Sequence, residues 1–271
     1  MDAGHLLPLA QLRTKDSTIG RQRIALGRGR LWNPEDLFNP IFPLAVEPGQ
    51  RIGQDSAVAR VRLAEGFWAS AIVSPQDDYR DYRSAVRLDY EHVALDAGAM
   101  FGDFRGDLVW GVDFATNVGG AAFRGEATYS SIRGRDNVWQ AVASLDHNLD
   151  IGKGLYVLVE YLYNENTAPR SRFVQALARG QLPVLDRITT VRKHQLGMQA
   201  RYEITPLLSG AALVLYDWDG RSAVLVPSLS YSPLADVVVS VAGQLFVGKA
   251  SGRNDYGDTP GLLIVSVDVY F

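Results

Sequence analysis

The last ten residues of the chain carry an apolar side chain at every second position. In 262–271, LLIVSVDVYF, every second residue from Leu263 to Phe271 is hydrophobic, while Ser266 and Asp268 occupy the other face. A period of two is the side-chain period of a β-strand. A strand with one apolar and one wettable face needs an apolar medium on one side and water on the other, as in the wall of a transmembrane barrel.

The same alternation recurs through the carboxy-terminal third of the chain. In 194–204, apolar residues alternate with polar and charged ones such as Gln195 and Arg201, and the segments 222–232 and 236–247 repeat the pattern. A polar face of this kind could not lie against hydrocarbon. The repetition predicts several consecutive amphipathic strands rather than a single terminal motif.

Composition excludes several classes of protein. Apolar residues make up 47% of the 271 residues, and no uninterrupted apolar run approaches the roughly 18 to 20 residues that a spanning helix needs. If the chain crosses a membrane, it does so as strands. The absence of cysteine excludes disulfides and thiolate metal sites. A net charge of −3 without a basic stripe argues against nucleic acid as a partner.

Fifteen segments separated by turn signals are predicted to be strands. They lie at 6–13, 18–27, 57–64, 66–74, 83–91, 93–104, 107–117, 120–132, 137–147, 154–164, 192–204, 208–217, 222–232, 236–247 and 262–271. Their spacing is close to the ~10 residues of a tilted membrane-spanning strand. We therefore expect an all-β fold, an antiparallel up-and-down transmembrane β-barrel, as a single domain over residues 1–271.

The start of the chain conflicts with an outer-membrane location. Met1 is followed by Asp-Ala-Gly-His, with no basic start, no apolar stretch and no small-residue cleavage site of a secretory signal. Single-chain bacterial barrels usually have an even number of strands. We therefore expect the fifteen strands to belong to a barrel of roughly sixteen or more strands that is truncated at its amino terminus.

The lengths of the connections between predicted strands differ between the two ends of the predicted barrel. The long connections occur at alternate positions along the chain, and those between them are short. Outer-membrane barrels keep short turns on the periplasmic side and long loops outside. With Phe271 on the periplasmic side, the long loops 28–56, 165–191 and 248–261 are predicted to be external or folded into the lumen.

The segment 19–55 has the most distinctive sequence. A strand carrying Gly-Arg-Gln leads to Gly-x-Gly and then to Asn-Pro-x-Asp-x-x-Asn-Pro, and these elements are Gly20, Arg21, Gln22, Gly27, Gly29, Asn33, Pro34, Asp36, Asn39 and Pro40. The segment resembles one found in a family of large, mostly uncharacterised, porin-like Gram-negative outer-membrane barrels. The resemblance implies a signal peptide and earlier strands, which the chain as given lacks.

The terminal strand also carries a resemblance. It is similar to the signal strand that closes Gram-negative outer-membrane barrels, with Tyr270 and Phe271 as its aromatic end. The resemblance implies that these residues are an assembly signal read by the barrel-assembly machinery. It also implies outer-membrane lipid as a partner and the bacterial outer membrane as the location.

Two Asn-Pro pairs restrict the backbone around Asp36. The proline rings fix φ at Pro34 and Pro40, and they push Asn33 and Asn39 out of the helical region while the asparagine side chains can close local turns. We predict a stiff, ordered loop. Two placements stay open: the loop folds into the lumen and narrows a pore, or it is braced on the external rim.

The inward faces of the predicted strands carry both signs of charge. The predicted pore-lining residues are Arg21, Arg23, Arg60, Arg62, Arg87, Arg124, Arg201, Asp113, Glu126 and Glu160. Opposite charges on neighbouring strands form ion pairs that stiffen a wall. The alternative is that Arg21, Arg23, Arg60 and Arg62 create a local anion-preferring field.

Catalytic patterns are sparse. The four histidines show no metal-ligand spacing, and none accompanies a nucleophile-elbow motif, so no metal, cofactor or enzymatic activity is predicted. The predicted function is a porin-like channel for passive diffusion of small hydrophilic solutes. The alternatives are an outer-membrane hydrolase of lipase or esterase type with a rim active site, and a barrel for polymer export. A soluble lipocalin-like or sandwich protein is disfavoured, because fifteen strands with long loops on one side exceed what those folds need. The oligomeric state stays open.

Overall fold

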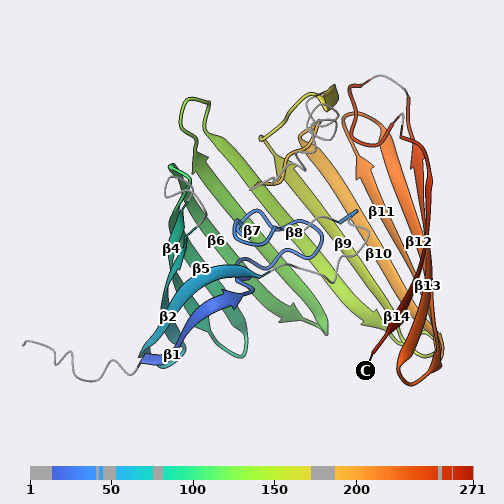
Figure 1. Ribbon diagram of the computed structural model, residues 1–271, viewed down its shortest axis with the longest axis horizontal. Coiled ribbons are helices and arrows are strands. Elements are labelled where there is room, and N and C mark those ends of the chain that lie inside the picture. The colour runs from blue at the N-terminus through green and yellow to red at the C-terminus, as the bar shows by residue number, and fades with distance from the viewer. Residues whose placement is uncertain are drawn as a thin grey trace, which may run out of the picture.

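The computed structural model describes residues 14–40, 43–44, 53–75, 82–171, 187–249, 252–257 and 259–270, with side chains from residue 17 onward. Its strands are β1 (Thr14–Gln22), β2 (Gln54–Ala64), β3 (Phe67–Ser74), β4 (Arg83–Glu91), β5 (Leu95–Phe104), β6 (Asp107–Val118), β7 (Ala121–Ser131), β8 (Val138–Leu149), β9 (Leu155–Asn164), β10 (His194–Thr205), β11 (Leu208–Asp217), β12 (Ser222–Leu234), β13 (Val237–Val247) and β14 (Leu262–Val269). Each strand pairs antiparallel with the next in one sheet (Figure 1). The predicted all-β, antiparallel up-and-down fold is confirmed.

The strand positions follow the sequence pattern closely. Fourteen of the predicted strands coincide with β1 to β14 to within a few residues, and the predicted strand 6–13 lies outside the described residues. The largest difference is at β1, which ends at Gln22 instead of residue 27. The chain leaves the sheet there because the Ile24 amide donates to Asn39 Oδ1 at 2.9 Å and Gly27 adopts a φ of 72°.

The long connections all occur at one end of the sheet, as predicted. At one end of the sheet the strands are joined by the short turns 65–66, 92–94, 119–120, 150–154, 206–207 and 235–236. The long connections 23–53, 75–82, 165–193 and 248–261 all join strands at the other end of the sheet, and residues 23–40 of the first fold back into the concave side, in the middle of Figure 1. These are called the short-turn end and the long-loop end. Within the described residues, no helix is long and apolar enough to cross a bilayer.

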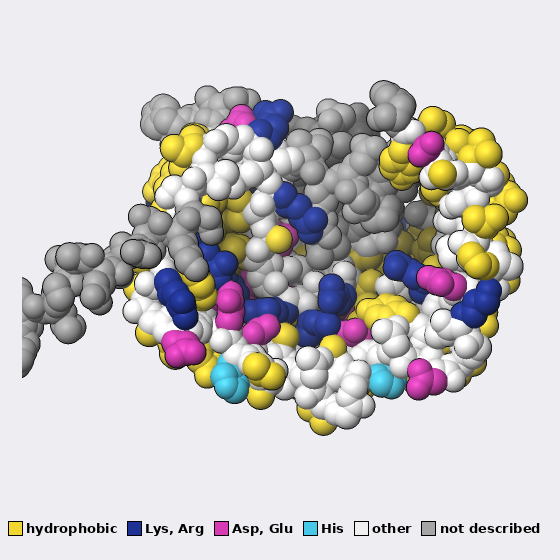
Figure 2. All heavy atoms as spheres, turned by 90° about the horizontal axis from the view of Figure 1, so that it is seen from below, with side chains coloured by type: hydrophobic (Ala, Val, Ile, Leu, Met, Phe, Trp, Pro, Cys, Tyr) yellow, Lys and Arg dark blue, Asp and Glu magenta, His cyan; other side chains and the backbone are white. Residues whose placement is uncertain are grey.

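The two faces of the sheet have opposite chemistry. On β4, Val86 and Leu88 are 56% and 57% exposed on the convex face, whereas Arg87 between them points to the concave face and is only 7% exposed. Leu263, Val265 and Val267 of β14 are likewise mostly exposed. Figure 2 views the molecule from the short-turn end, with hydrophobic side chains around the outer wall and charged ones around the inner wall.

The sheet curves strongly about the segment that joins β1 to β2 (Figure 1). In the described part of the chain, β1 pairs only with β2 and β14 pairs only with β13. The two edge strands therefore stay unpaired with each other. The described residues thus form a curved sheet of fourteen strands.

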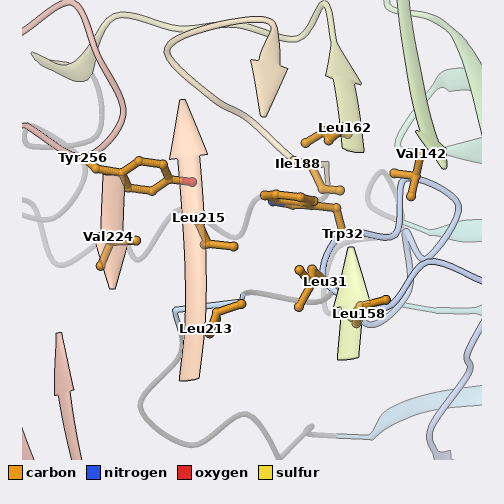
Figure 3. Close-up of a cluster of buried hydrophobic side chains, with 10 residues drawn as sticks. All are labelled: Leu31, Trp32, Val142, Leu158, Leu162, Ile188, Leu213, Leu215, Val224 and Tyr256. Carbon is orange, nitrogen blue, oxygen red and sulfur yellow. The ribbon is translucent and has the colours of Figure 1, made fainter. Parts of the chain in front are cut away.

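The concave face is more apolar than the sequence pattern predicts. Leu31 and Trp32 of the β1–β2 connection pack on Leu158, Leu162 and other wall residues in a buried cluster (Figure 3). A second cluster places Ile24, Leu26, Leu37 and Phe38 against Ile72, Ala85, Met100, Phe104 and Val109. The rings of Phe38 and Phe104 meet edge to face at 5.2 Å. These contacts show that the connection lies on the concave face, so the placement on an external rim is wrong.

Candidate functional site

The candidate site is built around residues 23–40, here called the inner segment. Its Asn-Pro motifs fold it locally. Asn33 Nδ2 donates to the Leu26 carbonyl at 2.6 Å, and Asn33 Oδ1 accepts the Asp36 amide at 2.9 Å. Asp36 Oδ1 accepts the Asn39 amide at 2.9 Å. Because short polar side chains close successive turns, the segment is ordered as predicted.

Two wall carboxylates hold the backbone of the inner segment. Glu126 of β7 accepts the amides of Arg28 and Gly29 through Oε2, at 2.6 and 2.7 Å. Glu160 of β9 accepts the amides of Arg30, Leu31 and Trp32 at 2.7–2.8 Å. Successive backbone N–H groups form a concavity suited to an anion, and hydrogen bonds to a charged acceptor are stronger than neutral ones. Glu126 and Glu160 therefore clamp the segment to the wall.

The Gly-x-Gly pair permits this close approach. At Gly29 an added Cβ would lie 1.8 Å from the Trp32 carbonyl oxygen. At Gly27, which has a φ of 72°, it would lie 2.3 Å from Asn33 Oδ1 and 2.6 Å from Glu126 Oε2. Any other residue would therefore displace the backbone from the carboxylate that binds it.

Arg87 forms the centre of a buried ionic network. Its guanidinium contacts Glu35 at 3.0 Å, Asp113 at 2.6 Å and Asp89 at 2.7 Å. Arg28 of the inner segment also reaches Asp113, with Nε 2.8 Å from Oδ1. Burial and the neighbouring Asp113 carboxylate raise the pKa of Glu35 well above its usual value. The network thus joins the inner segment to β4 and β6.

The remaining predicted arginines occupy three environments. Arg60 on the concave face pairs with Glu91 at 2.5 Å and lies 4.5 Å from the centre of the Trp68 ring, which Arg62 also covers. Arg124 pairs with Asp146. Arg201 is exposed on the same face of β10 as Gln195. The structure thus places these residues, Asp113, Glu126 and Glu160 on the concave face.

The placement of Arg21 on the inward face is wrong. Arg21 pairs in register with Asp55, and its guanidinium bonds that carboxylate at 3.2 Å on the convex face. Ile19, two residues earlier on the same strand, is 86% exposed and fixes the outward parity. Arg23 is also not a strand residue, because β1 ends at Gln22. The predicted cluster of Arg21, Arg23, Arg60 and Arg62 therefore does not form.

A cavity of about 480 Å³ lies beneath the inner segment. Its lining includes Arg23, Arg28 and Arg30 of the inner segment and Arg124 of β7. Residues of the β4–β5 turn, such as His92, place it toward the short-turn end. Arg28 and Arg30 were not among the predicted pore-lining residues because they follow the end of a predicted strand and lie in a predicted loop. The repeated Arg-Gly of GRGR was the available signal, because a glycine-rich backbone can fold back and bring its arginines together.

The long-loop end carries a second polar cluster. Asp255 accepts the amides of Val191 and Arg192 at 2.7 and 3.1 Å, and Gln195 Nε2 at 2.8 Å. Asp217 accepts the Asp255 amide at 2.9 Å. Burial, with the Asp217 charge nearby, raises the pKa of Asp255 to about 6. These contacts join the connections before β10 and β14.

The other predicted sites are only partly described. The Tyr270 amide donates to the Asp236 carbonyl at 2.9 Å, which extends the β13–β14 pairing beyond Val269, and its side chain is exposed. Phe271 lies outside the described residues. Among the described histidines, His194 contacts Tyr161 at 2.5 Å and His147 contacts the Gly120 carbonyl at 2.9 Å.

Comparison with known proteins adds no assignment. No protein-family model matches the chain, and no curated protein matches it significantly.

Proposed function

We propose that this protein is an outer-membrane β-barrel that acts as a porin-like channel for passive diffusion of small hydrophilic solutes. The observation that carries the proposal is the inverted distribution of its side chains. Arg87, Asp113, Glu126 and Glu160 are buried on the concave face, and large apolar side chains cover the convex face. A soluble protein has the opposite arrangement.

Energetics favour a lipid environment for the convex face. Burial of one Val, Leu, Ile or Phe side chain is worth about 1.5–3 kcal/mol. Exposed apolar side chains occur along the sheet from Ile19 of β1 to Val269 of β14. Transfer of all these side chains from water to hydrocarbon therefore makes a large favourable contribution to the free energy of the protein in a membrane.

Closure of the sheet is part of the proposal. In hydrocarbon each unpaired backbone N–H or C=O costs several kcal/mol, so a spanning sheet has no free edges. Either β1 meets β14 directly or further strands lie between them. The long-loop end would then face outward and the short-turn end the periplasm, with the terminal strand read by the barrel-assembly machinery.

The inner segment sets the width of the proposed channel. It lies on the concave face and is held by Glu126 and Glu160. Solutes would pass beside it through water, with selection by size and by the charges of the remaining opening. Its two apolar clusters fix it to the wall and leave its arginines toward the cavity.

Conductance in planar lipid bilayers tests the proposal. The refolded protein is expected to give discrete single-channel currents, and the Glu126→Gln/Glu160→Gln double variant is expected to give larger or noisier currents because the clamp is weakened. Glu203→Gln, which changes an exposed carboxyl on the same face, is the matched control and should conduct like wild type. Absence of current from protein that has inserted into the bilayer would contradict the proposed function.

A further inference from the structure

We infer that the cavity beneath the inner segment binds small anionic solutes bearing carboxylate or phosphate groups. This inference rests on the proposed function and names the solute class of the channel. The cavity combines a volume of about 480 Å³ with four arginines, Arg23, Arg28, Arg30 and Arg124. Pockets for small molecules commonly fall within 300–1,000 Å³, so a small solute fits.

The four arginines differ in whether a carboxylate contacts them. Arg28 is matched by Asp113 at 2.8 Å and Asp96 at 3.5 Å, and Arg124 is matched by Asp146. The guanidinium groups of Arg23 and Arg30 make no ion pair or hydrogen bond with any residue that the structure describes. Within the described residues, two guanidinium groups of the cavity thus have no carboxylate in direct contact.

Two carboxylates near the cavity, those of Asp36 and Glu160, accept backbone amides. Asp36, which lines the cavity, is buried and accepts the Asn39 amide. Glu160 lies behind Arg30, but its two oxygens accept three backbone amides. The N–H groups of Arg23 and Arg30 therefore stay available to a solute, and a partly enclosed site of low dielectric strengthens the attraction between their charges and an anion.

Arginine also suits the geometry of the proposed solutes. Its planar guanidinium donates two parallel N–H bonds to a carboxylate or phosphate, which adds directional specificity to the charge. Arg23 and Arg30 come from the two sides of Gly27 on one ordered segment, so the local fold that the Asn-Pro motifs impose also positions both donors.

The cavity lies on a path from the short-turn end. His92 and Ala94 of the β4–β5 turn and Asn117 near the end of β6 contribute to its lining. Viewed from this end, Lys and Arg side chains gather on the inner wall together with Asp and Glu (Figure 2). An anion entering from the short-turn end would therefore reach the arginines before the narrow part of the channel.

Reversal potentials and inorganic phosphate test the inference in the refolded protein. In a KCl gradient, wild type should favour chloride over potassium, and phosphate should block the chloride current in a saturable way. The Arg23→Gln/Arg30→Gln variant should lose the preference for chloride. The phosphate concentration that blocks half of the current should rise roughly tenfold, because two charge-assisted donors are removed. The control Arg201→Gln changes a concave arginine outside the cavity and should behave like wild type.

Each outcome supports or overturns the inference. Conduction with selectivity and block unchanged in the double variant, or changed equally by Arg201→Gln, would overturn it while the proposed function stands. If the protein does not conduct, the proposed function fails. Calorimetric titration of inorganic phosphate into wild type and the double variant in detergent then decides the binding site alone. Equal heats for the two proteins, or no binding to either, would overturn it.

Discussion

Gly29 shows how one position fixes the geometry of the site. Its amide reaches Glu126 Oε2 at 2.7 Å, and a Cβ would lie 1.8 Å from the Trp32 carbonyl oxygen. Backbone atoms cannot rotate away as a side chain would, so relief of the clash moves the inner segment away from the wall. Glycine at this position therefore permits the close backbone approach that the hydrogen bond to Glu126 requires.

We expect Gly29→Ala to destabilise the protein by about 1–3 kcal/mol, the usual cost of forcing added volume into a packed site. The measurement is the urea midpoint of refolded protein in lipid vesicles. Gly243→Ala is the control, because its nearest neighbour would be 3.8 Å from the new Cβ. Equal midpoints for the two variants would show that the inner segment is not held as described.

Glu35 carries a pH dependence with a defined sign. The buried network sets Arg87 and Arg28 against Glu35, Asp89 and Asp113, so a proton on Glu35 balances the charge. Its pKa is raised above 4.5, so the folded state holds this proton more tightly than the unfolded state. The Glu35 contribution to stability therefore increases as pH falls from the raised pKa toward 4.5.

The Glu35→Gln variant should remove this part of the pH dependence, because the amide resembles the protonated carboxyl and does not titrate. The Arg87→Gln variant should cost about 3–5 kcal/mol, since it leaves buried carboxylates without their cation. Urea unfolding at several pH values between 4.5 and 8 gives the free energy of unfolding of each variant. The slope of this free energy with pH distinguishes the two variants. An unchanged slope in Glu35→Gln would contradict the assigned protonation.

At the scale of elements, the inner segment is the feature that local sequence rules describe least completely. The Asn-Pro motifs predict its order, and the hydrogen bonds of Asn33, Asp36 and Asn39 account for that order. Its position on the concave face depends on Glu126 and Glu160, which are about a hundred residues away or more. No local pattern encodes such contacts, so both placements of the loop were compatible with the sequence.

Hydrogen exchange measures the clamp directly. In wild type the amides of residues 28–32 should exchange slowly because carboxylates accept them. In the Glu126→Gln/Glu160→Gln variant we expect exchange at least tenfold faster there, since each neutral acceptor binds more weakly. The ladder amides of β12 and β13 serve as an internal reference and should keep their rates. Unchanged protection of residues 28–32 would contradict the role of the two carboxylates.

Strand prediction succeeded where the pattern has a strict period. Val86, Arg87 and Leu88 show the rule, since one residue of register reverses the face. Arg21 shows the limit of this rule, because its predicted inward position disagrees with the outward position of Ile19 on the same strand. Arg23 was assigned to a strand face because the strand was predicted to reach residue 27, whereas β1 ends at Gln22. The apolar patches on the concave face were not predicted for a different reason. Leu158 and Leu162 lie on the concave face, where they pack against Leu31 and Trp32 of a segment that is distant in the sequence.

At the scale of the whole molecule, the account depends on the medium that meets each face of the sheet. The period of the sequence predicts two unlike faces, and the side chains confirm that they are unlike. The proposed outer-membrane location and closed barrel require hydrocarbon at the convex face and water at the concave face. The absence of cysteine offers a clean test, because a single introduced cysteine can be labelled uniquely.

Spin labels along β12 in lipid vesicles give the most direct measurement. Single-cysteine variants at Leu225, Leu229 and Tyr231 of the convex face are compared with variants at Ser228 and Ser230 of the concave face. The account predicts that collisions with oxygen, which concentrates in hydrocarbon, dominate at the first group, and that collisions with a water-soluble nickel chelate dominate at the second. Equal access of the nickel chelate to both groups would contradict it.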